Sequence, residues 1–135
     1  MRGGWGRANF EMATILCIDD DVVLLESQKH VLESKGYTVL TASDASAGAA
    51  LIRKNSIDAV VLDFDMPSMD GGQAAEILMQ ERPTPPIGIC SGCLDIIPEC
   101  LKWFADALYG KGDGLATLLA TVEKLVGKKA LARTA

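Results

Sequence analysis

The chain has 135 residues, of which 49% are hydrophobic and 23% are charged, and its formal net charge is -5. These values favour one globular domain with a substantial core, and they exclude a disordered chain or a disulfide-stapled scaffold. The acidic balance argues against binding nucleic acid through its phosphates, and no apolar run reaches the roughly 20 residues that span a bilayer. Because the N-terminus also lacks the apolar segment of a secretory signal, we expect a cytoplasmic protein without a membrane partner.

The two ends of the chain differ in pattern from its middle. Residues 1–12 are rich in glycine and aperiodic, so we expect a flexible N-terminal extension there. The periodic part predicts one domain over residues 13–127. Residues 128–135 are expected to form a C-terminal tail.

Five short apolar runs predict β-strands that are buried on both faces. They lie at residues 14–18, 37–42, 59–63, 87–90 and 107–110. Patterns typical of helices separate them, at residues 22–35, about 45–54, 71–81, 98–104 and 114–126. Ser43 or Asp44 is the expected cap of the second of these helices.

This alternation of strands and helices predicts an α/β fold, in which helices cover both faces of a doubly wound, five-stranded parallel sheet. In such sheets the functional crevice lies at the carboxyl ends of the strands. Several polar residues follow or end the predicted strands and should meet at that edge: Asp19, Asp20, Asp21, Asp63, Ser91 and Lys111.

The chemistry of these residues favours phosphoryl transfer. Clustered carboxylates repel one another unless a cation joins them, and a set of oxygen ligands favours Mg²⁺. A carboxylate such as Asp63 can attack phosphorus, while Lys111 and Ser91 can stabilise the transferred charge. Asp21 is explained equally well as the cap of the following helix. The Cys90–Cys93 pair resembles a redox or zinc motif, but no second pair accompanies it.

This ordered set resembles the receiver domain of bacterial two-component response regulators, over about residues 13–127. The resemblance implies a (βα)5 fold with the flavodoxin-like strand order 2-1-3-4-5. It also implies a role for each matching residue: Asp63 as phosphoacceptor, Asp19 and Asp20 as the metal-binding acids, Ser91 as switch hydroxyl and Lys111 as active-site lysine. Asp63 and the backbone carbonyl of Phe64 or Asp65 would complete the Mg²⁺ site; by family analogy we choose Asp65.

The resemblance further implies a signalling protein rather than an enzyme, apart from slow autodephosphorylation. Its phosphoryl donor would be a histidine kinase or a histidine phosphotransfer protein. The downstream protein would bind the face formed by the fourth helix and the fifth strand. The sequence leaves the oligomeric state open, and this face is also where a homodimer would be sought. Because the sequence leaves no room for an output domain after Val126, we expect a stand-alone receiver.

Three departures from the family lie in the second half of the chain. Gly112 stands where a proline usually follows the lysine, so a cis peptide there is in doubt. Leu108 occupies the aromatic switch position, and the neighbouring Tyr109 should face the opposite side of the sheet. The segment before Lys111 is short and contains Pro98, which predicts a short or displaced fourth helix. We therefore expect normal phosphorylation but signalling through an unusual surface.

Asp65 and Cys93 flank the phosphoacceptor position in this family. Asp65 adds negative charge beside the phosphoryl group, so we predict that it modulates the lifetime of the phosphorylated state.

Two alternatives compete with this interpretation. A degenerate receiver would act as a phosphate-independent protein-interaction module. The Asp63-Phe64-Asp65 spacing also suggests a phosphatase of the haloacid dehalogenase type. In those enzymes the motif usually lies on the first strand and is followed by a threonine or valine, whereas here it lies on the third strand and is followed by Met66-Pro67.

Overall fold

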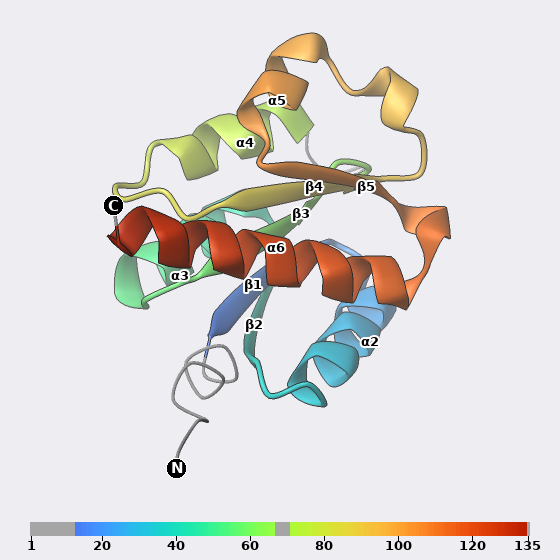
Figure 1. The fold of residues 1–135 in the computed structure, drawn as a ribbon. Helices are drawn as coiled ribbons and strands as arrows, with labels where there is room; N and C mark the ends of the chain where they lie inside the picture. The colour runs from blue at the N-terminus through green and yellow to red at the C-terminus, as the bar shows by residue number, and fades with distance from the viewer. Residues whose placement is uncertain (1–12, 67–70, 135) are drawn as a thin grey trace.

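The computed structural model describes residues 13–66 and 71–134, and its centre is one sheet of five parallel strands (Figure 1). The strands are β1 (Thr14–Ile18), β2 (Thr38–Ala42), β3 (Ala59–Asp63), β4 (Ile87–Ser91) and β5 (Ala107–Gly110). Their order is β2-β1-β3-β4-β5, which confirms the predicted doubly wound sheet. Two limits differ by one residue: β2 begins after Tyr37, and β4 includes Ser91. The expected extension at residues 1–12 lies outside the described residues.

Helices cover both faces of the sheet, as the buried strands require. They are α2 (Val22–Glu33), α3 (Ala45–Lys54), α4 (Gly71–Met79), α5 (Glu99–Phe104) and α6 (Leu115–Thr134), with short 3-10 turns η2 (Leu94–Ile96) and η3 (Lys111–Asp113). Asp44 caps α3, because its carboxylate accepts a hydrogen bond of 2.7 Å from the N–H of Ala47. No helix within residues 13–66 or 71–134 combines the length and the apolar character needed to cross a membrane.

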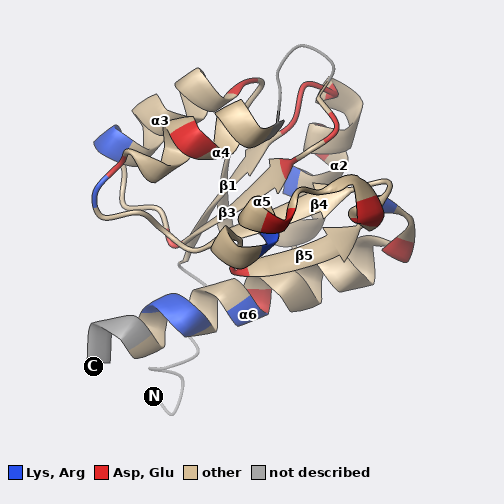
Figure 2. Cartoon of the chain, turned by 90° about the horizontal axis from the view of Figure 1, so that it is seen from above, with Lys and Arg blue, Asp and Glu red and all other residues tan. Residues whose placement is uncertain are grey.

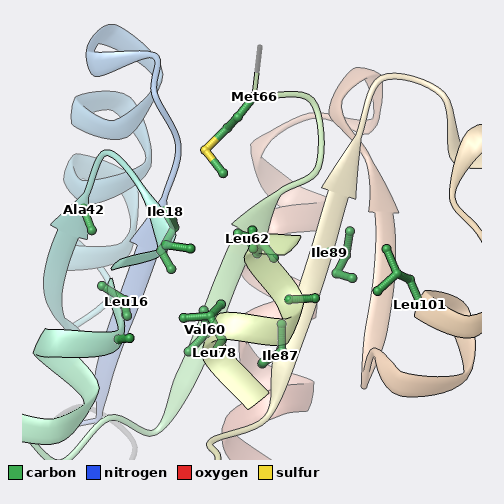
Figure 3. Close-up of a cluster of buried hydrophobic side chains, with 14 of the residues drawn as sticks. Leu16, Ile18, Ala42, Val60, Leu62, Met66, Leu78, Ile87, Ile89 and Leu101 are labelled. Carbon is green, nitrogen blue, oxygen red and sulfur yellow. The ribbon is translucent and has the colours of Figure 1, made fainter. Parts of the chain in front are cut away.

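Strand side chains alternate between two apolar clusters, one on each face. The cluster beneath α3, α4 and α5 takes its buried strand residues from β1, β2, β3 and β4, as Figure 3 shows: Leu16, Ile18, Ala42, Val60, Leu62, Ile87 and Ile89. The cluster beneath α2 and α6 takes the alternate positions, among them Ile15, Cys17, Val61, Cys90 and Tyr109. Each fully buried aliphatic side chain stabilises the fold by about 1.5–3 kcal/mol, so both faces hold the strands in this register.

The last helix is longer than the sequence predicts. α6 continues past Val126 to Thr134, so residues 128–134, which the sequence predicts as a C-terminal tail, are helical. The basic residues Lys128 and Lys129 lie in this part of α6 (Figure 2). The limit of the domain at residue 127 stays a prediction.

Two ion pairs explain the longer helix. Lys129 Nζ lies 3.3 Å from Asp58 Oδ1, and Lys128 forms an ion pair with Asp106. The two carboxylates are themselves bound to the amino ends of strands, since Asp58 and Asp106 accept hydrogen bonds of 2.8 Å from the N–H groups of Thr14 and Ile87. The end of α6 is therefore tied to the edge of the sheet opposite its carboxyl ends.

The segment between β4 and β5 matches the predicted departure from the family. α5 has six residues and begins directly after Pro98, which confirms a short fourth helix. In the part of the chain that the structure describes, the peptide bond before Pro83 is the one cis bond, so the Lys111–Gly112 bond is trans.

Candidate functional site

The carboxyl ends of four strands bring the predicted site residues to one edge of the sheet. Asp19 follows β1, Asp63 ends β3, Ser91 ends β4 and Lys111 follows β5. The strand register keeps them level, because Asp63 is opposite Cys90, the residue before Ser91. Viewed from above, acidic segments of the chain gather next to α2 (Figure 2).

Three carboxylates meet at this edge. Asp19, Asp20 and Asp63 each offer an oxygen atom, and these atoms lie within 4.8 Å of one another. Asp19 and Asp63 are almost fully buried, with exposed fractions of 2% and 3%, and Asp20 is partly buried. Carboxylate oxygens are the ligands that Mg²⁺ prefers, so this donor set fits the ion that the sequence predicts.

Asp21 positions this acidic cluster and caps a helix. Its carboxylate accepts hydrogen bonds from the N–H groups of Val23 and Leu24, at 3.0 and 3.2 Å. Its own N–H donates to Asp19 Oδ1 at 2.9 Å. Of the two interpretations left open for Asp21, the structure therefore shows the helix cap, with an indirect contribution to the orientation of Asp19.

Lys111 neutralises the buried charge of Asp63. Its Nζ atom lies 2.9 Å from Asp63 Oδ1, and the same oxygen accepts a hydrogen bond of 3.0 Å from the N–H of Asp65. An ionised carboxylate at this depth requires such partners. Burial lowers the pKa of Lys111, but the hydrogen bond and the charge of Asp63 outweigh it and raise this pKa above its ordinary value.

The pKa of Asp19 lies above that of an exposed carboxylate. Burial raises the pKa of Asp19 to about 6, and the negative charge of Asp63 adds to the effect. The hydrogen bond from Asp21 and the charge of Lys111 oppose it. Burial therefore disfavours the ionised form of Asp19, and a bound cation would stabilise it.

The side chain of Asp65 takes a position that the sequence did not predict. One carboxylate oxygen accepts a hydrogen bond of 2.8 Å from the Ser91 hydroxyl, and the other accepts one of 2.6 Å from the N–H of Gly92. Lys111 Nζ lies 3.7 Å from the second oxygen. Burial raises the pKa of Asp65, but these three partners outweigh burial and lower it. The spacing of Asp63 and Asp65 was the sequence signal for this position. In an extended chain, side chains two residues apart point to the same side, so the Asp65 side chain points to the side of Asp63.

Ser91 is fully buried and held on two sides. Besides its bond to Asp65, its oxygen accepts a hydrogen bond of 3.1 Å from the N–H of Cys93. The Cys93 carbonyl, also at 3.1 Å, is a second acceptor for the single hydroxyl hydrogen.

The two cysteines of the Cys90–Cys93 pair do not form a shared site. Cys90 is buried, which raises its pKa to about 11, whereas Cys93 is exposed.

A comparison with protein families identifies the family of this chain. The model of the response regulator receiver domain matches residues 15–122. The chain belongs to this family. The predicted family is thereby confirmed over most of the chain.

Two individual proteins resemble the chain in sequence. It is 36% identical over 120 residues to the probable transcriptional regulatory protein TcrX of Mycobacterium tuberculosis, covering 89% of this chain and 49% of that protein. It is 31% identical over 123 residues to the protein PilH of Pseudomonas aeruginosa, covering 91% of this chain and 94% of PilH. The chain thus spans about half of the first relative and nearly all of the second.

Solved receiver structures share the fold. A CheY-like receiver domain of Methanospirillum hungatei JF-1 is 27% identical, with a TM-score of 0.80 over 90% of this chain and 98% of that one. The response regulator TrrA of Thermotoga maritima, solved in complex with Mg²⁺ and BeF, is 25% identical, with a TM-score of 0.75 over 84% of this chain and 99% of TrrA.

Membership of the family fixes the general role. Receiver domains act in two-component signalling, where they interact with histidine kinases or phosphotransfer proteins and with downstream targets. They are generally signalling domains rather than enzymes, and they generally bind Mg²⁺ at an acidic pocket such as the one formed by Asp19, Asp20 and Asp63.

Proposed function

We propose that this receiver accepts a phosphoryl group on Asp63 and thereby switches a protein partner. The observation that carries the proposal is the pairing of Asp63 with Lys111 at 2.9 Å, beside two further carboxylates at the same strand edge. One oxygen of Asp63 would form a bond to phosphorus while the P–N bond of a phosphohistidine breaks. The imidazole nitrogen would keep the electron pair of that bond.

The metal site of this proposal consists of carboxylates from Asp19, Asp20 and Asp63, with the backbone carbonyl of Asp65 as a further ligand. Bound Mg²⁺ would stabilise negative charge on phosphoryl oxygens. The buried Asp19, whose pKa is raised, supports a cation requirement. Among residues 13–66 and 71–134, Lys111 is the one positive charge that lowers this pKa, and it is already paired with Asp63. The relative TrrA, solved with Mg²⁺ and BeF, is a precedent within the family.

Lys111 and Ser91 would bind the transferred phosphoryl group. Lys111 carries a positive charge within reach of Asp63, and the Ser91 hydroxyl lies at the end of the adjacent strand β4. Donors that are already in position stabilise developing charge without reorganisation. Ser91 would also transmit the effect of phosphorylation toward α5, because it is buried at the start of the segment that leads to this helix.

The experiment that tests the phosphoacceptor is intact mass after incubation with acetyl phosphate and Mg²⁺. The expected product carries one phosphoryl group, is stable in acid and labile in base, and needs Mg²⁺. Asp63→Asn is the matched control and should give no adduct. If the folded wild-type chain takes up no phosphoryl group from acetyl phosphate or from a cognate kinase, the phosphate-independent interaction module is the better description.

We further propose that the downstream partner binds the face formed by η2, α5 and β5, which could also support a homodimer. Three hydrophobic side chains there are exposed: Leu94, Ile96 and Trp103, with exposed fractions of 36%, 60% and 86%. Exposed aromatic anchors are typical of protein interfaces. The proposed donors, histidine kinases or histidine phosphotransfer proteins, would place this exchange in the cytoplasm. Replacing Trp103 by Ser should leave stability unchanged and weaken binding to the partner.

A further inference from the structure

The carboxylate of Asp65 lies among three hydrogen-bond donors of the site. It accepts from Ser91 Oγ at 2.8 Å and from the N–H of Gly92 at 2.6 Å, and it lies 3.7 Å from Lys111 Nζ. Two of these donors come from the end of β4 and the third follows β5. The carboxylate of Asp65 therefore bridges the two strand ends that face Asp63.

On the function proposed above, a phosphoryl group on Asp63 would need these same donors. Lys111 is bound to Asp63 and to Asp65 at once, so both carboxylates compete for one ammonium group. Ser91 has a single hydroxyl hydrogen, and the N–H of Gly92 is a single donor. Neither can serve a phosphoryl oxygen fully while it is bound to Asp65.

The fit of the carboxylate in this position is close. A Cβ atom on residue 92 would lie 3.3 Å from the nearer oxygen of Asp65, which is tighter than ordinary contact. Glycine at this position thus allows the short hydrogen bond from the backbone. Hydrogen bonds to an ionised acceptor are roughly twice as strong as neutral ones, so the arrangement opposes removal of Asp65.

We propose that Asp65 is an internal competitor that occupies the phosphoryl-binding donors of the unphosphorylated chain and must be displaced when Asp63 is phosphorylated. The displaced carboxylate turns away from Ser91 and Gly92, and phosphoryl oxygens take its place. Asp65 thereby sets a threshold for phosphorylation. Phosphoryl transfer from a weak phosphoryl donor, or binding of a phosphoryl mimic at low concentration, is disfavoured. This role differs from an effect on the lifetime of the phosphate, because it acts before phosphoryl transfer.

Two variants separate competition for donors from simple charge repulsion. Asp65→Ala removes both the charge and the acceptor atoms, whereas Asp65→Asn removes the charge and keeps one amide oxygen that can accept from Ser91 or Gly92. Competition predicts that half-saturation by beryllofluoride with Mg²⁺ falls about tenfold in Asp65→Ala, with a smaller fall in Asp65→Asn. Repulsion alone predicts equal falls. The exposed Asp95 provides a control for net charge through Asp95→Asn, which should leave half-saturation unchanged.

The measurement is an amide NMR titration with beryllofluoride, accompanied by the rate of phosphoryl uptake from acetyl phosphate. In the unliganded chain, the Gly92 amide proton should move upfield in Asp65→Ala, because it loses a charged acceptor. Uptake should be faster in Asp65→Ala than in wild type. Three results would each overturn the competition. The first is equal half-saturation and equal rates in wild type and Asp65→Ala, and the second is equal gains in Asp65→Ala and Asp65→Asn. The third is slower uptake by a folded Asp65→Ala.

Failure of the competition and failure of the proposed function give different results. If neither wild type nor Asp65→Ala forms an Asp63-dependent adduct with any phosphoryl donor, the phosphoacceptor function itself is wrong and the competition falls with it. If both form the adduct at the same rate, Asp63 remains the phosphoacceptor and the competition alone is refuted.

Discussion

Leu108 and Tyr109 are neighbours in β5, and their side chains pack on opposite faces of the sheet. Leu108 is partly buried against the cluster beneath α3, α4 and α5, whereas Tyr109 is buried in the cluster beneath α2 and α6. The prediction that Tyr109 faces away from the switch position is confirmed. The position at which the resemblance predicts an aromatic switch residue therefore has a leucine, and the nearby tyrosine is a core residue.

Tyr109→Phe should leave the free energy of unfolding unchanged or raise it. Among the buried side-chain nitrogen and oxygen atoms in the described parts of the chain, the Tyr109 hydroxyl is the one without a geometrically good hydrogen-bond partner. The nearby Cys90 thiol is a weak partner, so removal of the hydroxyl relieves a poorly satisfied polar group. Tyr109→Ala should instead cost about 3–5 kcal/mol, because it leaves a cavity in the core. Urea denaturation measures both. A loss above about 1 kcal/mol in Tyr109→Phe would mean that the hydroxyl has a stronger partner.

Lys111→Met should reduce phosphoryl uptake from acetyl phosphate by about a hundredfold, since one charged donor aimed at the developing charge is lost. The variant also leaves the buried Asp63 carboxylate without its ion-pair partner at 2.9 Å. Uptake is followed by intact mass, and folding by circular dichroism. Lys124→Met, on the exposed side of α6, is the matched control and should behave as wild type. Normal uptake by Lys111→Met would exclude Lys111 from the phosphoryl site.

Mg²⁺ affinity should fall as the pH falls through about 6. Burial and the charge of Asp63 raise the pKa of Asp19 to about 6, so below this pH protons compete with the cation for the carboxylate. One pH unit below this pKa, the affinity should be about tenfold weaker than its plateau. Calorimetric titrations at several pH values measure the effect. An affinity that stays constant between pH 7 and pH 5 would contradict the role of Asp19 as a ligand.

The same pKa predicts the pH dependence of stability without metal. Folded Asp19 holds its proton up to about pH 6, whereas its ordinary value is 3.8, so its contribution favours the folded state at low pH. This contribution is lost as the pH rises through about 6. Asp19→Asn should therefore be more stable than wild type in EDTA at pH 7, with a smaller difference near pH 4. Thermal unfolding of the two proteins at both pH values tests the sign.

Lys129→Met should lower the free energy of unfolding by about 1 kcal/mol, and Lys128→Met by less. The Lys129 side chain is 21% exposed and binds both the Asp58 carboxylate and the Ile57 carbonyl. The Lys128 side chain is 57% exposed and pairs with Asp106, so solvent screens its ion pair more strongly. Equal stability of Lys129→Met and wild type in urea would show that the contacts of Lys129 do not stabilise the fold.

The sequence alone was sufficient for the sheet and for most of the candidate site. Apolar runs such as Ala59–Leu62 predict buried strands from composition, and the carboxyl ends of parallel strands must share an edge. Asp19, Asp63, Ser91 and Lys111 therefore meet there whatever the details of packing. The opposite orientation of Leu108 and Tyr109 followed from the two-residue period of a strand, which is also a local property.

Only the tertiary structure decided the orientation of the Asp65 carboxylate and the end of α6. Asp65 turns toward Ser91 and Gly92, residues 26 and 27 positions away, because donors on the neighbouring strand compensate its charge. Likewise, Lys129 finds Asp58 across the fold, 71 positions back in the chain, and this contact is invisible to helical periodicity. Both features depend on which charged groups the folded chain brings together. Local pattern determines the strands and their ends, whereas long-range electrostatic pairing determines how the side chains at those ends are arranged.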